Sequence, residues 1–462
     1  MNRSIIKDIE NWYTRSNRKP LVLRGARQVG KSTAVKMFAS QTNTILHEIN
    51  LEKHPSLTDV FKTMDIKLIL KELQFISQKG SISAENSILF LDEIQCVPDA
   101  IKCLRYFYEE QPDLAVIAAG SLLEFTLRSE NFSIPVGRIE YLYMEPVTFE
   151  EFLLARNRSD LFELLNQYSI YKPFPEMAHT QLLQEFRLYL LIGGMPEAIQ
   201  IYIDSQDIFE SFRVQTSINE TYRDDFGKYS SRAVLPKVQR VFDYIPASLG
   251  EKLKYSNISS DDKAADLRSA IDLLSQSGLI RPFFHSKADG VPLKSSINKK
   301  VFKCYFLDCG LVNRICGIEY ISNEELFKAS WINKGELAEQ FIAQHLPAAL
   351  NSNEKFTGTY WLREGGKGNA EVDFLIQIGN SIYPIEVKAG ASGSLKSLLY
   401  FMYQKSLTRT VRFDLNKPTL QQIEHSIRTA DKNVLVKGQI LSLPVYSVLQ
   451  LKRILQEIQF TQ

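Results

Sequence analysis

The chain of 462 residues contains few cysteines and none in metal-binding pairs. Zinc sites in proteins usually join Cys and His ligands at short, regular spacings. The five cysteines include no CxxC pair, and none of the six histidines stands at such a spacing from them. The cysteines are Cys96, Cys103, Cys304, Cys309 and Cys316. The sequence therefore predicts no zinc site, and the unpatterned set is typical of reduced thiols in a cytosol-like compartment.

Long apolar runs are also absent. No stretch of about 18 apolar residues, the length that spans a bilayer, occurs anywhere in the chain. The opening residues, MNRSIIKDIENWYTRSNRKP, contain no apolar core of the signal-peptide type. We therefore expect a soluble, cytoplasmic protein that has no membrane partner.

Neither sign of charge dominates the composition. The 55 Lys and Arg residues nearly balance the 53 Asp and Glu residues, so the net charge is +2. A contact with nucleic acid would then depend on a local basic patch rather than on the field of the whole protein. One candidate patch is residues 287–303, KADGVPLKSSINKKVFK, which contain five lysines and one aspartate.

Short apolar segments alternate with helical patterns in the first third of the chain. Strands are expected at PLVLRG, at TILHEINL (44–51), at SILFLD (87–92) and at LAVIAAG (114–120). Apolar strands separated by helices predict an α/β fold with a parallel sheet covered on both faces. From about residue 148 the pattern is mainly helical. Residues 236–310 then follow the order helix, turn, long helix, strand, basic loop and strand, which is that of a winged helix.

The motif GARQVGKS follows the first strand and opens a helix. It matches G-x-x-x-x-G-K-[ST], in which glycines let backbone N–H groups surround phosphates at a helix N-terminus. Lys31 would reach the β- and γ-phosphates of ATP, and the Ser32 hydroxyl would bind Mg²⁺. The predicted nucleotide-binding loop comprises Gly25, Ala26, Arg27, Gln28, Val29, Gly30, Lys31, Ser32 and Thr33.

Two adjacent acids leave the buried strand ILFLDE. Asp92 is expected to hold Mg²⁺ and Glu93 to polarise the attacking water, so that Glu93 is the predicted catalytic residue of an ATPase. A cap on the next helix is the plainer alternative for such a pair.

Two further residues are weaker candidates for the nucleotide site. Ser121 follows the strand VIAAG and is either a γ-phosphate sensor or an N-cap. Arg138 is either an ordinary surface arginine or a group that stabilises transition-state charge, in cis or across a subunit interface of an oligomer.

The stretch EVDFLIQIGNSIYPIEVKAG, residues 371–390, predicts a β-hairpin that turns at Gly379-Asn380. With that centre Asp373 faces Glu386, Glu371 faces Lys388, and these four side chains share one face. Opposed carboxylates favour a cation between them, and a hard ion such as Mg²⁺ fits. Lys388 would orient or activate an attacking water and neutralise developing charge. Pro384 could place a bulge here, which would shift this register by one.

On these motifs the chain resembles the AAA-14 group of AAA+-like P-loop ATPases. LVLRGARQVGKST, ILFLDEIQ, AAGS and GRIEYLYMEPVTFEEF carry that resemblance. IGGMPEA, YFLDCGL and EVDFLI…PIEVKAG resemble the DUF4143 domain that usually follows it. The resemblance implies a C-terminal domain similar to PD-(D/E)XK nucleases, which are restriction-endonuclease-like α/β folds. That pattern favours Glu339 over Glu336 as a further metal ligand and has Val372 where Pro is common.

Together these features predict four regions: a P-loop ATPase core (1–160), a helical lid or linker (161–230), a winged helix (231–310) and a nuclease-like domain (311–462). The leading hypothesis is an ATPase coupled to Mg²⁺-dependent cleavage of nucleic acid, with ATP and Mg²⁺ as cofactors. DNA is the favoured substrate and RNA the open alternative, because the sequence does not reveal the type of nucleic acid. The alternative is a nucleotide-driven switch or scaffold whose nuclease-like domain binds nucleic acid or a protein without cutting. The winged helix is equally interpretable as a structural lid, and Arg138 alone does not support a processive motor.

Overall fold

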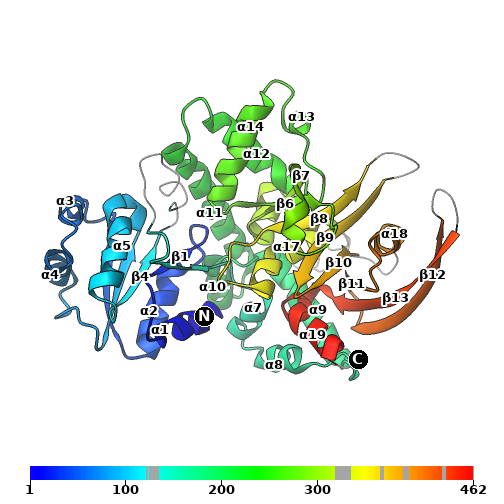
Figure 1. The fold of residues 1–462 in the computed structure, drawn as a ribbon, viewed down its shortest axis with the longest axis horizontal. Helices are drawn as coiled ribbons and strands as arrows, with labels where there is room; N and C mark the ends of the chain where they lie inside the picture. Colours follow the sequence, from blue (N-terminus) through cyan, green and yellow to red (C-terminus); the bar gives the residue numbers. More distant parts are fainter. Residues whose placement is uncertain are drawn as a thin grey trace. The chain divides into compact units, whose positions relative to one another are not determined.

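The structure is a computed structural model that describes residues 1–120, 123, 135–317, 335–364, 369–388, 395–428 and 433–460. Two compact units are distinguished in it (Figure 1). The first unit comprises Met1–Val147 with the short segments Gln276–Gly278 and Asn351–Lys355. The second comprises Thr148–Ser275, Leu279–Leu350 and Phe356–Gln462.

A five-stranded parallel sheet in the order β2-β3-β4-β1-β5 is the centre of the first unit. Its strands are β1 (Leu21–Arg24), β2 (Ile45–Asn50), β3 (Ser87–Asp92), β4 (Ala115–Ala119) and β5 (Glu140–Tyr143). Its helices are α1 (Ile5–Tyr13), α2 (Lys31–Gln41), α3 (Leu57–Lys62), α4 (Ile66–Ser77), η1 (Ile94–Cys96) and α5 (Pro98–Glu110). The parallel α/β fold predicted from the alternating pattern is confirmed.

The central strand β3 shows why its sequence is apolar throughout. Leu89 and Leu91 pack into the cluster formed with α3, α4 and α5. Ile88 and Phe90 are equally buried but lie outside that cluster. Because successive side chains of a strand point to opposite faces, both faces of this sheet are covered.

The second unit begins with helices and continues into an eight-stranded mixed sheet of order β12-β13-β11-β10-β9-β8-β6-β7. The helices before the sheet are α7 (Phe149–Ala155), α8 (Ser159–Gln167), α9 (Glu176–Ile192), α10 (Pro196–Ser205), α11 (Ile208–Tyr229), α12 (Leu235–Ala247), α13 (Tyr255–Ile258) and α14 (Ala264–Gln276). The last residue of α14, Gln276, belongs to the first unit.

The remaining elements complete this sheet and cover it. The strands are β6 (Ile280–Ser286), β7 (Ile297–Phe306), β8 (Gly358–Arg363), β9 (Ala370–Ile378), β10 (Ser381–Val387), β11 (Arg409–Asp414), β12 (Thr419–Arg428) and β13 (Asn433–Pro444). The helices are η2 (Leu293–Ser296), α15 (Cys309–Ile315), α17 (Gly335–Leu350), α18 (Lys396–Lys405), η3 (Val445–Gln450) and α19 (Leu451–Phe460).

Helices α12, α13 and α14 and the hairpin β6–β7 follow one another in the predicted order of helices and strands, and their assignment as a winged helix stays a prediction. That hairpin also pairs with β8 in parallel, so the eight-stranded sheet runs across the boundary predicted at residue 310. The bounds of the four predicted regions stay predictions.

The hairpin β9–β10 has the predicted register. Ser381 pairs with Ile378, and the pairing continues without a shift to Ile385 opposite Phe374. Pro384 produces no bulge in this ladder. It lacks an N–H group, but pairing of β10 with β11 begins only at Ile385, so no ladder hydrogen bond to β11 is lost. The Pro384 carbonyl accepts a hydrogen bond from Thr410 Oγ1 over 3.0 Å. The pairing of β9 with β10 ends at Phe374 and Ile385, before Asp373 and Glu386, so these two do not form the ladder pair that was predicted.

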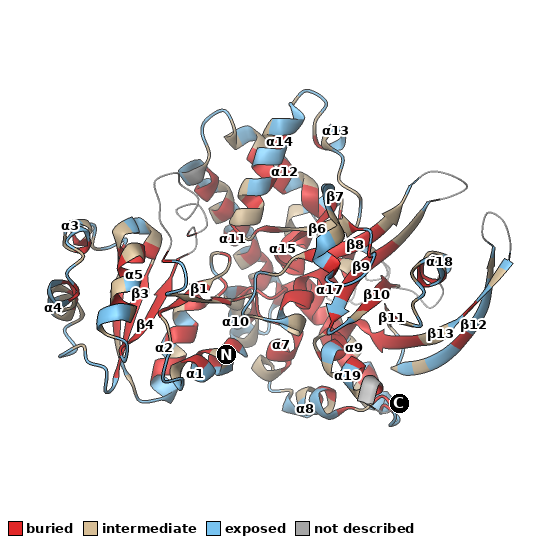
Figure 2. Cartoon of the chain, viewed as in Figure 1, coloured by how far each residue is buried: buried red, intermediate tan, exposed pale blue. Residues whose placement is uncertain are grey.

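An irregularity occurs instead in the pairing of β9 with β8, whose register shifts between Thr359 and Trp361. The strict alternation predicted for β9 therefore fails near Asp373. Val372 packs with Leu398 and Phe401 of α18, whereas Phe374, expected on the same face, contacts the rings of Phe283 and Tyr305. Figure 2 shows β9 and β10 as buried central strands, so the hairpin is not a surface hairpin with one solvated face.

The carboxylate of Asp308 joins three parts of the second unit. It is fully buried and accepts hydrogen bonds from the N–H groups of Gly194 and Gly310, at 2.5 and 3.0 Å, and from Gln344 Nε2 at 3.0 Å. These partners lie after α9, at the start of α15 and in α17. The motifs IGGMPEA and YFLDCGL, far apart in sequence, therefore meet at one buried charge.

Gly193 tests this arrangement directly. Its φ is +72°, and a Cβ placed there would lie 2.1 Å from Asp308 Oδ1. We expect Gly193→Ala to lower the free energy of unfolding by about 2–4 kcal/mol, because the backbone is strained and the carboxylate is displaced. The measurement is urea denaturation followed by circular dichroism.

Gly227→Ala is the matched control, since a Cβ there would meet nothing within 4 Å. In a helix this change should be neutral or stabilise by up to about 1 kcal/mol. Equal unfolding midpoints for the two variants would contradict the role given to Asp308.

Candidate functional site

The phosphate-binding loop connects β1 to α2 through backbone conformations that few residues adopt. Gly25 has a φ of +149°, and a Cβ there would lie 2.3 Å from the Met144 carbonyl oxygen. Gln28 and Gly30 also have positive φ values, of 65° and 96°. The glycines of the motif are thus required by the turn itself, which ends at the N-terminus of α2.

Lys31 lies folded over this loop. Its Nζ donates to the carbonyl oxygens of Gly25, at 3.0 Å, and Ala26, at 2.8 Å. Burial lowers the pKa of Lys31 to about 8, and the nearby Glu93 and Asp92 only partly oppose this shift. An ammonium held by neutral carbonyl groups can exchange them for phosphate oxygens at little cost.

Ser32 and Asp92 come together as predicted. Ser32 Oγ donates to Asp92 Oδ2 over 2.8 Å, although the two residues are 60 positions apart. Burial raises the pKa of Asp92, and the hydrogen bond from Ser32 opposes that shift. A hydroxyl and a carboxylate oxygen in contact are the hard donors that Mg²⁺ prefers, so this pair fits the ion expected with a nucleotide.

Glu93 lies next to this pair and has a partner that the sequence did not suggest. Gln95 Nε2 donates to Glu93 Oε2 over 2.6 Å. A Cβ at Gly120 would lie 2.1 Å from Gln95 Oε1, so the end of β4 leaves room only for glycine beside this amide. Gln95 therefore fixes the orientation of Glu93, and the motif DEIQ contains both residues.

Two weaker candidates have different outcomes. Ser121 lies outside the described residues. Arg138 pairs with Glu109 at 3.0 Å and precedes β5, whose first residue, Glu140, is opposite Leu21 at the start of β1. The phosphate loop follows the other end of β1, more than about 10 Å away at the rise of a strand. In this structure Arg138 pairs with Glu109 and not with the loop, and its role toward the nucleotide, in cis or across a subunit interface, stays a prediction.

A second cluster of charges lies where β9 and β10 separate. The Val387 N–H donates to Asp373 Oδ2 over 2.7 Å, so Asp373 points toward β10. Lys388 Nζ lies 2.5 Å from Glu386 Oε1. The other carboxylate oxygen of Glu386, Oε2, is buried and has no hydrogen-bond partner.

The electrostatics of Glu386 and Lys388 follow from their burial and from each other. Burial and the charge of Asp373 raise the pKa of Glu386 to about 7, while Lys388 opposes the shift. Burial lowers the pKa of Lys388, but the charges of Glu386, Asp373 and Glu339 outweigh it and raise the pKa overall. Lys388 is thus an ammonium group, suited to orient water and stabilise negative charge rather than to remove a proton.

Glu339, from α17, approaches the same cluster. Tyr305 OH donates to Glu339 Oε2 over 2.8 Å, and Lys303 Nζ lies 3.9 Å from that oxygen. Burial and the charge of Asp373 raise the pKa of Glu339 to about 8. Glu336, the competing candidate, is exposed.

The three carboxylates expected to bind Mg²⁺ do not form a ready metal site. Within the ranges that the structure describes, no group of three or more His, Cys, Asp and Glu side chains is placed to hold a metal ion. The chemistry of the donors still fits, because the unpartnered Oε2 of Glu386 is a buried hard oxygen beside Asp373. The ligand role of each carboxylate stays a prediction.

Lys303 and Tyr305 are functional candidates that sequence reasoning missed. Lys303 was counted in the basic patch 287–303, but it is fully buried and pairs with Glu371. The patch therefore has four exposed lysines instead of five: Lys287, Lys294, Lys299 and Lys300. The alternation of VFKCYF places Lys303 and Tyr305 on one face of β7, and this was the signal available.

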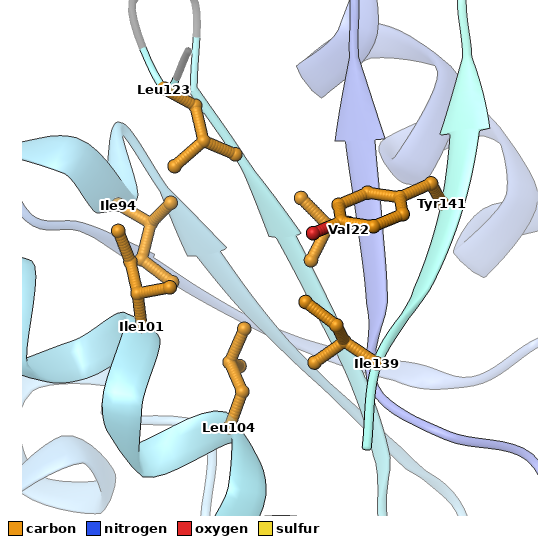
Figure 3. Close-up of a pocket in the computed structure, with 7 residues that line it drawn as sticks. All are labelled: Val22, Ile94, Ile101, Leu104, Leu123, Ile139 and Tyr141. Carbon is orange, nitrogen blue, oxygen red and sulfur yellow. The ribbon is translucent and has the colours of Figure 1, made fainter. Parts of the chain in front are cut away.

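An apolar pocket lies between α5 and the sheet of the first unit (Figure 3). Its lining residues are Val22, Ile94, Ile101, Leu104, Leu123, Ile139 and Tyr141. No carboxylate or ammonium group lines it, so it is space within the hydrophobic core rather than a site for phosphates.

A parallel sheet with a phosphate loop after β1 and two adjacent acids at the end of β3 defines a P-loop nucleotide-binding protein. Residues 17–153 match an AAA domain family, AAA_14, and residues 334–444 match a domain of unknown function, DUF4143. The chain therefore carries an AAA_14 domain followed by a DUF4143 domain, as the resemblance of its motifs implied. Residues 183–322 match a further domain of unknown function, DUF8612.

Similarity to other proteins is distant. No match is found among curated proteins. The solved ORC2 protein of Aeropyrum pernix is 11% identical, with a TM-score of 0.33 over 68% of this chain and 94% of that chain. The RuvB Holliday junction branch migration motor of Thermotoga maritima is 16% identical, with a TM-score of 0.25 over 61% of this chain and 89% of that one. Likenesses this low carry no functional conclusion.

None of the described helices combines the length and apolar character that a helix needs to cross a bilayer.

Lys31 and Arg138 should differ sharply in nucleotide binding. We expect Lys31→Ala to weaken ATP binding at least about 100-fold, because a charge-assisted contact to the phosphates is lost. Arg138→Ala should leave the Kd of the isolated monomer unchanged, because Arg138 pairs with Glu109 away from the loop. Titration with a fluorescent ATP analogue measures both, and equal losses would contradict this placement.

The low pKa of Lys31 makes ATP binding sensitive to pH. Below its pKa of about 8, Lys31 carries the charge that attracts phosphate. As pH rises above 8 the free protein loses this proton, so the Kd for ATP should rise by up to about tenfold per pH unit. Lys31→Arg keeps its charge and should bind with a Kd that stays constant from pH 7 to 9.5. A constant Kd in the unmodified protein would contradict the shift.

Proposed function

We propose that the chain is an ATP-hydrolysing AAA-type protein whose C-terminal cluster cleaves phosphodiester bonds of nucleic acid with Mg²⁺. One observation carries the proposal. Lys388 and a carboxylate oxygen of Glu386 that has no hydrogen-bond partner lie beside Asp373 at the buried junction of β9 and β10. Buried polar atoms without a partner are rare in folded proteins, and a cation that binds there would remove the cost.

The first unit would supply the nucleotide chemistry. The loop N–H groups and Lys31 would bind the phosphates, and Ser32 with Asp92 would hold Mg²⁺, which neutralises charge on the β- and γ-phosphates when it is bound. Glu93, oriented by Gln95, would polarise the water that attacks the γ-phosphorus. Hydrolysis would change the contacts of the loop, and we propose that this controls the C-terminal cluster.

The cluster of the second unit would act on a phosphodiester. Asp373 and Glu386 would hold one Mg²⁺, which when bound draws electron density from the phosphate. Lys388 would orient a water molecule for attack on phosphorus. The water loses a proton to solvent, the bond from phosphorus to the leaving oxygen breaks, and that oxygen takes up a proton. The charged Lys388 would stabilise the intermediate charge.

The hairpin β6–β7 supports a nucleic-acid substrate. Four exposed lysines lie on it, at positions 287, 294, 299 and 300. Lys300 is three residues from Lys303 on β7, which is about 10 Å along a strand. A sugar–phosphate backbone gripped by the exposed lysines would pass close to the cluster, and binding would weaken steeply with salt.

One observation favours the alternative, a nucleotide-driven switch whose C-terminal domain binds without cutting. Among the residues for which the structure gives positions, no three-carboxylate metal site is assembled. Under this alternative the lysines and carboxylates of the cluster neutralise one another, and ATP hydrolysis alone would survive in assays.

Plasmid cleavage separates the two functions. We expect the protein to cut supercoiled plasmid with Mg²⁺ or Mn²⁺, and Asp373→Ala to reduce the rate at least about 100-fold, because a metal ligand is lost. Lys31→Ala should abolish the response of cleavage to ATP. The readout is gel electrophoresis with and without ATP.

Glu424→Ala is the control for Asp373→Ala. Glu424 is an exposed carboxylate of β12 that pairs with Lys437 at 2.7 Å, so its loss should leave cleavage unchanged. Cleavage that persists in Asp373→Ala comes from a contaminant or another site. ATP hydrolysis without any metal-dependent cleavage would establish the switch instead.

A further inference from the structure

Lys303 is an internal cation in the C-terminal cluster. Its side chain is 1% exposed, and its Nζ pairs with Glu371 Oε1 and lies 3.9 Å from Glu339 Oε2. The same ammonium lies 5.0 Å from the centre of the Tyr360 ring. A lysine buried this completely is costly unless opposite charges surround it.

Carboxylates surround the ammonium group of Lys303. Burial lowers its pKa, but Glu339, Glu371 and Asp373 raise it more, so the pKa stands above its ordinary value. The ion pair with Glu371 and the nearby Glu339 show that Lys303 neutralises carboxylates from within the protein.

One carboxylate oxygen of Glu339, Oε2, already lies against protein groups. Besides the Tyr305 hydroxyl and Lys303, the turn after α12 closes on it: a Cβ at Gly250 would lie 2.8 Å from Glu339 Oε2. Mg²⁺ keeps several waters and requires near-octahedral space. Glu339 Oε2 accepts a hydrogen bond from Tyr305, whereas Glu386 Oε2 is buried and has no hydrogen-bond partner.

The charges of the cluster can be counted. Four carboxylates, of Glu339, Glu371, Asp373 and Glu386, face two ammonium groups, of Lys303 and Lys388. A bound cation favours the ionised forms of these carboxyl groups, and with all four ionised the balance is −4 + 2 = −2. A single divalent cation brings this balance to zero, whereas a second would leave an excess of positive charge in a buried place.

We propose that Lys303 takes the place of a second metal ion, so that the cluster binds one divalent cation through Asp373 and Glu386, without Glu339 as a ligand. This inference rests on the proposed function for the identity of the cation site, and it adds the number of ions and the role of Lys303. Lys303 is a positioning residue, because it acts through Glu339 and Glu371 and does not reach the reacting phosphate.

The number of bound Mn²⁺ ions tests this inference without any substrate. The full chain is used without nucleotide and with Asp92→Asn, so that the phosphate-loop site is not counted. We expect one Mn²⁺ per chain by titration with electron paramagnetic resonance, and none after Asp373→Asn. Zero or two ions in the starting chain would overturn the inference.

Two substitutions separate Lys303 from Glu339. Lys303→Met has a neutral side chain of similar length and should bind a second Mn²⁺, whereas Lys300→Met, on the exposed part of the same strand, should still bind one. A folded Lys303→Met chain that binds one ion with an unchanged Kd would refute the role of Lys303. If this variant does not fold, Glu339→Gln decides: it should keep one ion, and loss of that ion would show that Glu339 is a ligand.

The inference and the proposed function fail in different ways. A chain that binds one Mn²⁺ but cuts no plasmid refutes the nuclease function and leaves the inference intact. A chain that cuts plasmid but binds two ions refutes only the inference.

Discussion

The second unit depends on the burial of one carboxylate, that of Asp308. A buried charge destabilises a protein unless donors surround it. Here the donors are backbone N–H groups of Gly194, Gly310 and Leu311 and the amide of Gln344. Burial still raises the pKa of Asp308, which shows that the hydrogen bonds offset the cost of burial only in part. The helical segment before the sheet, the end of β7 and helix α17 must therefore stay together for this charge to be tolerated.

The same contacts place α17 against β7 and so position the C-terminal cluster. Gln340 Oε1 accepts from the Phe306 N–H and its Nε2 donates to the Phe306 carbonyl, both over 2.8 Å. Gln344 Oε1 accepts from the Cys309 N–H over 2.9 Å. The side-chain amides of Gln340 and Gln344 thus form hydrogen bonds with backbone groups at and just after the end of β7, as a neighbouring strand would. Glu339 precedes Gln340 in the helix and therefore meets Lys303 and Tyr305 of β7 as a consequence of this packing.

Local rules predicted much of this structure, and long-range contacts decided the rest. Sequence motifs predicted the P-loop and the closeness of Ser32 and Asp92. The turn at Gly379-Asn380 predicted the register of the hairpin. For these features the sequence alone was sufficient. The irregularity near Asp373 depends on pairing with β8, which no pattern within β9 reveals. Lys303 was misplaced for a related reason: lysine count predicts a surface patch, but its burial is set by carboxylates from α17 and β9. Arg138 precedes the start of β5, next to the start of β1, whereas the phosphate loop follows the end of β1, and sequence spacing does not reveal this.

Two buried lysines show how surroundings decide function. Lys31 has neutral carbonyl oxygens as its hydrogen-bond partners, and burial lowers its pKa to about 8. Its charge is poorly compensated, so an incoming phosphate group gains a strong interaction. Lys303 is surrounded by carboxylates that raise its pKa, so its charge is already compensated within the protein. Both sit in apolar protein within reach of acids, and only the first is poised to bind a ligand. Burial of a lysine therefore does not mark a phosphate site by itself; what marks it is an ammonium whose partners are neutral.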